Sequence, residues 1–134
     1  PPTSSRRQRQ MCIRDSYVVL SCPLTPETHH FIDEKALRLM KPTATLVNVA
    51  RGGVVDTDAL TTALKEGWIQ SAGLDVTEPE PLPRNHELLN FKNVVLAPHL
   101  GSATVQTRRA MAQLSVSNLL HGLAGQPLIR QVRY

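Results

Sequence analysis

The segment TLVNVARGGVVDTDALTTALKEGWIQSAGLDV, residues 45–76, decides the fold class. It begins with TLVNVA (45–50), a short apolar run with β-branched residues, which predicts a buried strand. Residues 54–67 follow with a capping candidate at Asp56, leucines at helical spacing and a terminal glycine, and they predict a helix. IQSAGLDV (69–76) predicts the next strand. A strand, a helix and a second strand in this order predict two parallel strands joined by a crossover helix.

The same alternation extends in both directions along the chain. YVVLSCP (17–23) and NVVLAPH (93–99) predict two further buried strands, and residues 33–40 predict a short helix that ends before Pro42. Residues 103–123 predict one long amphipathic helix. The whole order predicts an α/β fold: the second half of a doubly wound parallel sheet, covered on both faces, followed by a long C-terminal helix.

Composition places the chain among globular proteins. Its hydrophobic fraction of 41% and charged fraction of 19% are ordinary, and no apolar run is long enough to span a bilayer, so we expect no membrane partner. Cys12 and Cys22 do not suggest a disulfide framework, and a reducing, cytoplasmic setting is expected. The net charge of +4 comes mostly from residues 1–16, so we expect no nucleic-acid partner for the rest.

The basic head has neither the apolar core of a signal peptide nor the helical stripe of a transit peptide. A disordered arm that binds nucleic acid would fit its composition. A different interpretation fits better: RRQRQMCIRD, residues 6–15, can be back-translated into a widely used transposase sequencing adapter. We therefore expect residues 1–16 to be a non-native, disordered segment joined to a truncated gene, which the codons of the original read would test.

Ionisable residues follow three of the predicted strands. Ligands of parallel α/β sheets bind at the carboxyl ends of strands, and Arg51, Glu80 and His99 all lie there. A histidine paired with a carboxylate can carry a proton, and an arginine can hold a carboxylate and polarise a carbonyl. This set suits the reduction of a small 2-oxo acid, with a nicotinamide supplying the hydride.

Three blocks of the chain resemble a known family. LMKPTATLVNVARGGVVD (39–56), GLDVTEPEPLP (73–83) and APHLGSAT (97–104) are similar to the signatures of the D-isomer-specific 2-hydroxyacid dehydrogenases. The resemblance implies a Rossmann-like NAD(P)-binding domain and a catalytic set of Arg51, Glu80 and His99, in which Glu80 partners the histidine. It also implies cofactor contacts at Pro23, Val49, Ala50, Arg51, Asp75, His99 and Gly101, and substrate contacts at Arg51, His99 and Ser102.

Other features point to one branch of that family. ETHH (27–30) and EPLPRNHELL (80–89) look most like the glyoxylate and hydroxypyruvate reductases, a branch that includes 2-ketogluconate reductases. This implies NAD or NADP as cofactor, with a leaning towards NADPH, and a homodimer at full length. The family's long helix returns to a substrate domain, so the apolar side chains Met111, Leu114, Leu119 and Leu120 are expected to be core. The implied organisation is residues 17–102 as the C-terminal half of the cofactor domain and 103–134 as the return helix and tail.

One element of a dinucleotide site is missing from the sequence. No GxGxxG turn can be built from the glycines, so the pyrophosphate-binding motif is not present. The chain therefore resembles the carboxyl-terminal part of such an enzyme, and the exact 2-oxo acid and the choice between NAD and NADP stay open. Two alternatives remain: a dinucleotide-binding corepressor of the same fold, and a fragment without activity.

The adjacent histidines His29 and His30 invite a metal hypothesis. Neighbouring side chains point apart on regular backbone, and no cluster of cysteines or carboxylates in the sequence completes a site. The sequence therefore predicts no metal site.

Overall fold

The computed structural model describes residues 16–131, and the predicted basic head therefore lies almost wholly outside the described residues. Its central element is a four-stranded sheet in the order β1-β2-β3-β4. The strands are β1 (Tyr17–Leu20), β2 (Thr45–Asn48), β3 (Ser71–Leu74) and β4 (Val94–Leu96). Each strand pairs in parallel with the next, as the sequence predicted.

Two short helices connect the first three strands, and both begin at a capping aspartate. In α2 (Glu34–Arg38), the side chain of Asp33 accepts a hydrogen bond of 2.8 Å from the backbone N–H of Ala36. In α3 (Thr57–Lys65), Asp56 accepts one of 3.0 Å from the N–H of Ala59, so the predicted cap is confirmed. Two turns of 3-10 helix, η1 (Gly52–Val54) and η2 (Glu87–Asn90), complete this part of the chain.

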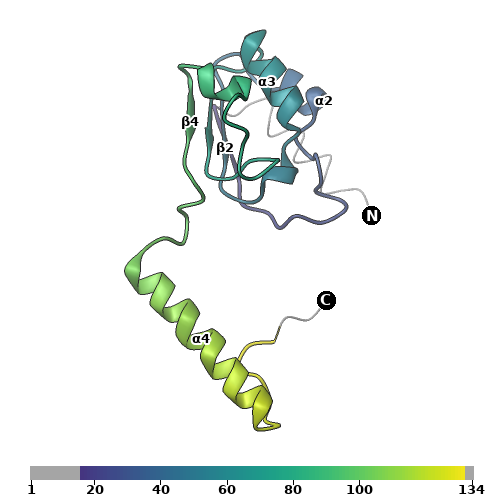
Figure 1. Cartoon of the computed structure of the whole chain (residues 1–134). Helices are drawn as coiled ribbons and strands as arrows, with labels where there is room; N and C mark the ends of the chain where they lie inside the picture. The colour runs from purple at the N-terminus through teal and green to yellow at the C-terminus, as the bar shows by residue number, and fades with distance from the viewer. Residues whose placement is uncertain (1–15, 132–134) are drawn as a thin grey trace. The chain divides into compact units, whose positions relative to one another are not determined.

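The core lies on one face of the sheet. Strand residues alternate between faces, and the inward set includes Leu20, Leu46 and Leu74, all buried. They belong to one apolar cluster with Leu37 of α2 and Leu60 of α3. Figure 1 shows α2 and α3 on the same side of the sheet.

The opposite face is open in the described part of the chain. Val19, Val47, Gly73 and Val95 pair in register across all strands, and Val19 and Val95 are 59% and 71% exposed. The expected cover on both faces is therefore wrong for the described residues. The reason is topological: sequential parallel strands joined by right-handed crossovers place all their connections on one side.

The described residues divide into two compact units, one up to His99 and one from Leu100 onward, and the expected domain division after residue 102 stays a prediction. The second unit holds α4 (Val105–Leu123), which begins at Thr104, whose hydroxyl accepts from the N–H of Thr107. The tail after the helix returns to it: the side chain of Asn118 in α4 exchanges hydrogen bonds of 3.1 and 3.2 Å with the backbone of Arg130. None of the helices in the described residues is long and apolar enough to cross a membrane.

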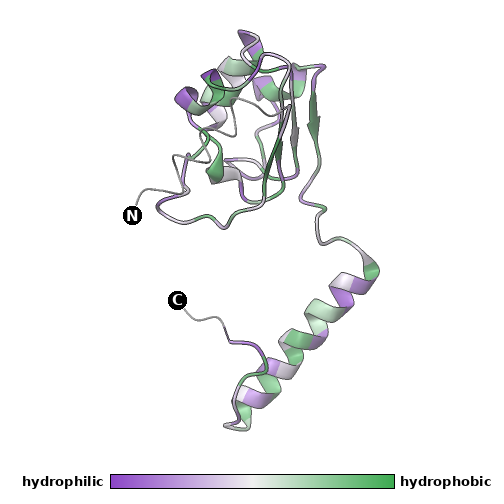
Figure 2. Cartoon of the chain, turned by 180° about the vertical axis from the view of Figure 1, so that it is seen from behind, coloured by the Kyte–Doolittle hydropathy of each residue, from purple (hydrophilic) through white to green (hydrophobic). Residues whose placement is uncertain are grey.

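The expected apolar core side of α4 is not found. No residue of the helix is buried, and Met111, Leu114, Leu119 and Leu120 are all exposed. Each residue turns a helix by about 100°, so Met111 and Leu120 lie on opposite sides of the helix, and Leu114 and Leu119 are about 140° apart. Figure 2 shows hydrophobic and hydrophilic positions alternating along α4.

The open sheet face generates a prediction about self-association. The double variant Val19→Lys with Val95→Lys should stay monomeric at concentrations where the unmodified chain associates, because contiguous exposed apolar side chains and an uncovered edge strand promote association. Light scattering measured across a concentration series tests this. Leu46→Lys, which places a charge in the core, is the control and should lose the far-ultraviolet circular dichroism of the fold. Equal scattering by the double variant and the unmodified chain would contradict the prediction.

Candidate active site

Main-chain hydrogen bonds continue past the ends of the strands and align the segments that follow them. The N–H of Val49 donates to Leu20 over 3.2 Å, that of Asp75 donates to Asn48 over 3.0 Å, and that of Ala97 donates to Leu74 over 2.8 Å. The three segments therefore leave the sheet side by side at its carboxyl end, where parallel sheets bind ligands.

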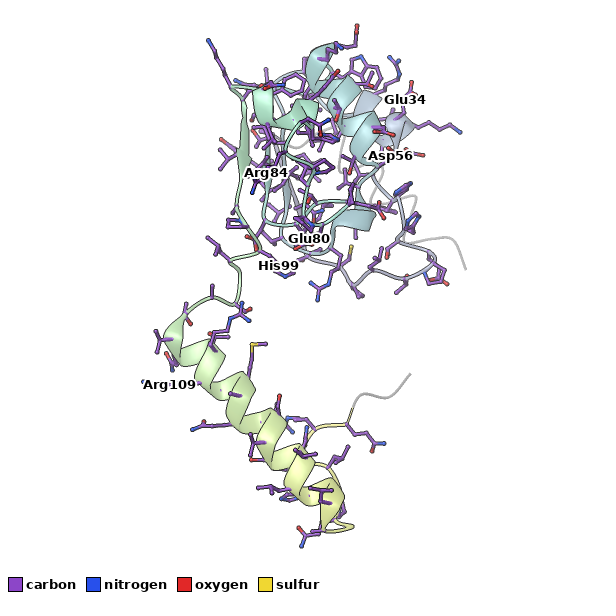
Figure 3. The ribbon with its side chains drawn as sticks, in the orientation of Figure 1. Glu34, Asp56, Glu80, Arg84, His99 and Arg109 are labelled. Carbon is purple, nitrogen blue, oxygen red and sulfur yellow. The ribbon has the colours of Figure 1, made fainter. Side chains whose placement is uncertain are left out.

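His99 and Glu80 meet at this end of the sheet. Nδ1 of His99 lies 2.7 Å from Oε1 of Glu80, and the two side chains are 45% and 41% exposed. Because an ionised carboxylate only accepts hydrogen bonds, the ring donates through Nδ1–H and leaves Nε2 for another partner. Figure 3 shows the two labelled side chains next to each other at the lower end of the sheet.

The backbone of His99 is held in an uncommon conformation. Its φ of 53° is in the left-handed region, which few non-glycine residues adopt. Its N–H donates to the carbonyls of Asp75 and Ala97, each over 3.0 Å. These bonds to the ends of β3 and β4 fix the place from which the imidazole projects.

A cavity of about 440 Å³ opens beside this pair. Glu80, His99, Asp75 and Thr77 supply its polar groups. Its apolar wall contains Leu82, Leu89 and Leu96. A concave, mostly apolar space with a few convergent polar groups is typical of a small-molecule site.

Arg51 is presented by a turn that Asn48 organises. Asn48 is 1% exposed; its side-chain amide donates to the carbonyl of Arg51 over 2.9 Å, and its oxygen accepts from the N–H of Ala50 over 3.0 Å. Asn48 is not among the site residues predicted from the sequence. The alternation of TLVN, which points Asn48 to the same buried face as Leu46, was the available signal.

The guanidinium of Arg51 does not complete the pair. Its NH1 donates to the carbonyl of the preceding Ala50 over 2.7 Å. The described contacts thus join His99 to Glu80, while Arg51 is bound to its own turn.

The other residues implied by the resemblance lie on both units. Val49 and Pro23 are exposed, Asp75 is half-buried and Ala50 is buried, all in the first unit. Gly101 and Ser102 belong to the second unit.

The turn of Arg51 packs directly against the loop that carries Glu80. A Cβ built on Gly52 would lie 1.9 Å from the carbonyl oxygen of Thr77, so only glycine allows this approach. The hydroxyl of Thr57 donates to the carbonyl of Glu78 over 2.7 Å. The peptide bonds before Pro79 and Pro81 are cis.

A second polar cluster lies beside this loop. The rings of His29 and His30 are stacked, with centroids 3.9 Å apart, so the expectation that they point apart is wrong. The reason is that His30 has a φ of 48°, which turns its side chain to the same side as that of its neighbour. Together with Glu78, they offer possible ligand atoms within 4.8 Å of one another. The prediction that the chain has no metal site remains a prediction.

The comparisons with known proteins agree on one family. A family model described as D-isomer specific 2-hydroxyacid dehydrogenase, NAD binding domain, matches residues 5–101. The matched range begins inside the segment 1–16, whose adapter origin remains a prediction.

Curated and solved relatives point the same way. A glyoxylate reductase of Thermofilum pendens is 57% identical over 113 residues, which are 84% of this chain and 33% of that protein. The TT0316 protein from Thermus thermophilus is 46% identical, with a TM-score of 0.88 over 93% of this chain and 40% of that chain. An NADPH-dependent glyoxylate/hydroxypyruvate reductase from Sinorhizobium meliloti, solved with NADP and malonate, is 39% identical, with a TM-score of 0.87 over 92% of this chain and 39% of that chain. The chain thus spans about a third of the length of the curated relative.

The packing of the Arg51 turn generates a stability prediction. Gly52→Ala should lower the free energy of unfolding by about 2–3 kcal/mol or more, because the new methyl group meets a main-chain oxygen that cannot move aside. Chemical denaturation followed by circular dichroism measures the loss. Gly73→Ala is the matched control, since its Cβ would meet only Val47 at 3.9 Å, an ordinary contact. Equal stability of the two variants would show that the turn and the loop are not packed as described.

Proposed function

Since the chain belongs to the D-isomer specific 2-hydroxyacid dehydrogenase family, we propose that it carries the catalytic half-site of an NAD(P)H-dependent reductase. The substrate is a small 2-oxo acid of the glyoxylate or hydroxypyruvate type, and the product is the D-2-hydroxy acid. One observation supports this proposal above the others: the 2.7 Å contact between His99 Nδ1 and Glu80 Oε1 at the carboxyl end of a parallel sheet, beside a cavity.

His99 is assigned the transfer of the proton. With Nδ1–H bound to Glu80, Nε2 is the ring nitrogen left for the substrate, and when protonated it can donate to a carbonyl oxygen. Glu80 orients the ring and determines which nitrogen faces the substrate. In the oxidation direction, the same nitrogen accepts the proton of the 2-hydroxyl group.

Arg51 is assigned the binding of the substrate carboxylate. A guanidinium presents a planar fork of N–H donors that can hold a carboxylate with two parallel bonds. The bond to the carbonyl of Ala50 uses one donor and leaves others on the same group. In this assignment the arginine also polarises the adjacent ketone.

A nicotinamide dinucleotide supplies the hydride when bound. The chain fits the nicotinamide end of such a cofactor, since Asp75 is accessible past β3 and the main chain of Val49 and Ala50 follows β2 at the same edge. It does not contain the Gly-rich turn that would receive the pyrophosphate. The S. meliloti relative, solved with NADP and malonate, favours NADP and a small carboxylic acid as ligands.

The proposal includes a homodimer at full length, a cytoplasmic location and no nucleic-acid partner. The apolar side chains of α4, among them Leu119 and Leu123, are exposed, and their burial against another subunit or domain would support the homodimer. The near-neutral charge outside residues 1–16 gives no sign of a phosphate-binding surface.

The roles of the three residues predict the kinetics of variants in a protein that carries this segment at full family length. His99→Gln should lower kcat about 100- to 10,000-fold for NADPH oxidation with glyoxylate or hydroxypyruvate, because the proton donor is lost. Arg51→Ala should raise KM as well as lower kcat. Arg84→Ala, an exposed arginine near the same loop, is the control and should keep the parent rate. Near-parent kcat in both site variants would refute the assignment, and dinucleotide binding without turnover by the parent would favour a corepressor.

The missing Gly-rich turn predicts how the chain behaves alone. It should bind NADH or NADPH weakly or not at all, because the pyrophosphate receives no cradle of backbone N–H groups. Isothermal titration calorimetry of this chain measures the affinity. A dissociation constant in the micromolar range would contradict the prediction and would place the pyrophosphate site within these residues.

A further inference from the structure

Glu78 and His30 join two loops that are distant in the sequence. Nε2 of His30 lies 2.8 Å from Oε2 of Glu78, and the other carboxylate oxygen lies 3.7 Å from Nε2 of His29. The loop after β1 thereby contacts the loop after β3. His30 reaches this position with a positive φ, which is uncommon for a residue other than glycine. Such an outlier persists only where the surrounding contacts maintain it.

The main chains of His30 and Glu78 are each held by a further hydrogen bond. The N–H of His30 donates to the carbonyl of Gly53 over 2.8 Å, which ties the histidine to the turn after Arg51. The carbonyl of Glu78 accepts from the hydroxyl of Thr57 at the start of α3. A Cβ on Gly53 would lie 3.1 Å from Oε1 of Glu78, so the carboxylate lies against that turn.

We propose that the hydrogen bond between His30 and Glu78, here called the clamp, positions the catalytic pair. Glu78 is two residues before Glu80, so fixing the Glu78 side chain fixes the start of the short segment from which Glu80 reaches His99. The clamp also ties this segment, through Gly53, to the turn that presents Arg51. His30 and Glu78 are thus positioning residues that act through Glu80 and Arg51 and do not touch substrate. Their role in catalysis rests on the proposed function, whereas their effect on the position of the His99 ring does not.

Metal binding is the competing use of these side chains, because His29, His30 and Glu78 offer three ligand atoms. The stacking of the two rings opposes it. A metal ion lies close to the plane of each imidazole that binds it, and two rings 3.9 Å apart with an interplanar angle of 22° cannot both meet this condition without turning. The oxygen nearest to His30 is already in a 2.8 Å hydrogen bond. The observed geometry therefore favours the clamp.

The test uses this chain and the ring ¹H–¹⁵N correlation spectra of its histidines. Glu80→Ala defines the His99 ring signals without the side-chain acceptor. Glu78→Ala should move the His99 signals at least half of the way to those values, and His30→Asn should do the same. Asparagine tolerates the left-handed backbone, so the second variant removes the ring without removing the conformation. Glu78→Gln, whose amide oxygen can still accept from His30, should keep the parent spectrum.

Glu34→Ala is the matched control. It removes a hydrogen bond of the same length, 2.8 Å to Arg38, between side chains that are also exposed, and it should leave the His99 signals unchanged. Thermal unfolding of each variant identifies any that fails to fold. If Glu78→Ala fails to fold, the comparison of His30→Asn with Glu78→Gln decides: the first should shift the His99 signals and the second should not. Parent-like His99 signals in Glu78→Ala and His30→Asn would overturn the proposal. So would a stoichiometric complex with zinc chloride that requires His29 and Glu78. Because the spectra do not depend on turnover, failure of the reductase assignment would leave this result intact.

Discussion

The hydrogen bond from the N–H of His99 to the carbonyl of Asp75 is the contact on which the site depends. It extends the parallel pairing of β3 and β4 beyond the last strand residues, to a residue whose backbone is in the left-handed region. Without it, the segment after β4 would leave the sheet in another direction, and its imidazole would not meet Glu80. The position of the proton donor is therefore a consequence of backbone pairing in the sheet.

The two histidine–glutamate contacts add little to the stability of the fold. The pair of His99 and Glu80 and the pair of His30 and Glu78 are each close to half exposed, and exposed ion pairs contribute about 0–1 kcal/mol to stability. Stability comes from the apolar cluster between the sheet and the two helices, and from close main-chain packing such as that of Gly52 against Thr77. The side chains of the site can thus be arranged for chemistry, because the fold does not rely on their mutual attraction.

The parallel strand order also explains why one face of the sheet is packed and the other is exposed in the described residues. Every described crossover places its helix on the face that contains Leu46 and Leu74, so the row from Val19 to Val95 has no cover within the described residues. The exposed side chains of α4 are a second surface of this kind.

The sequence alone determined the elements and their order. The β-branched runs, the capping residues Asp33 and Asp56 and the terminal glycine Gly67 act through contacts within a few residues, and the parallel pairing follows from the alternation of strands and helices. The same local signals located Arg51, Glu80 and His99 after strands, and segments that follow parallel strands leave the sheet at its carboxyl end.

Only the tertiary structure decided how these side chains meet. The stacking of His29 on His30 depends on one positive φ, the orientation of Arg51 depends on the carbonyl of Ala50, and the approach of Gly52 depends on a loop that begins after β3. None of these is periodic in the sequence. The approach of Gly52 to Thr77 joins segments that are far apart in the chain, and the backbone of His30 is held by the distant carbonyl of Gly53.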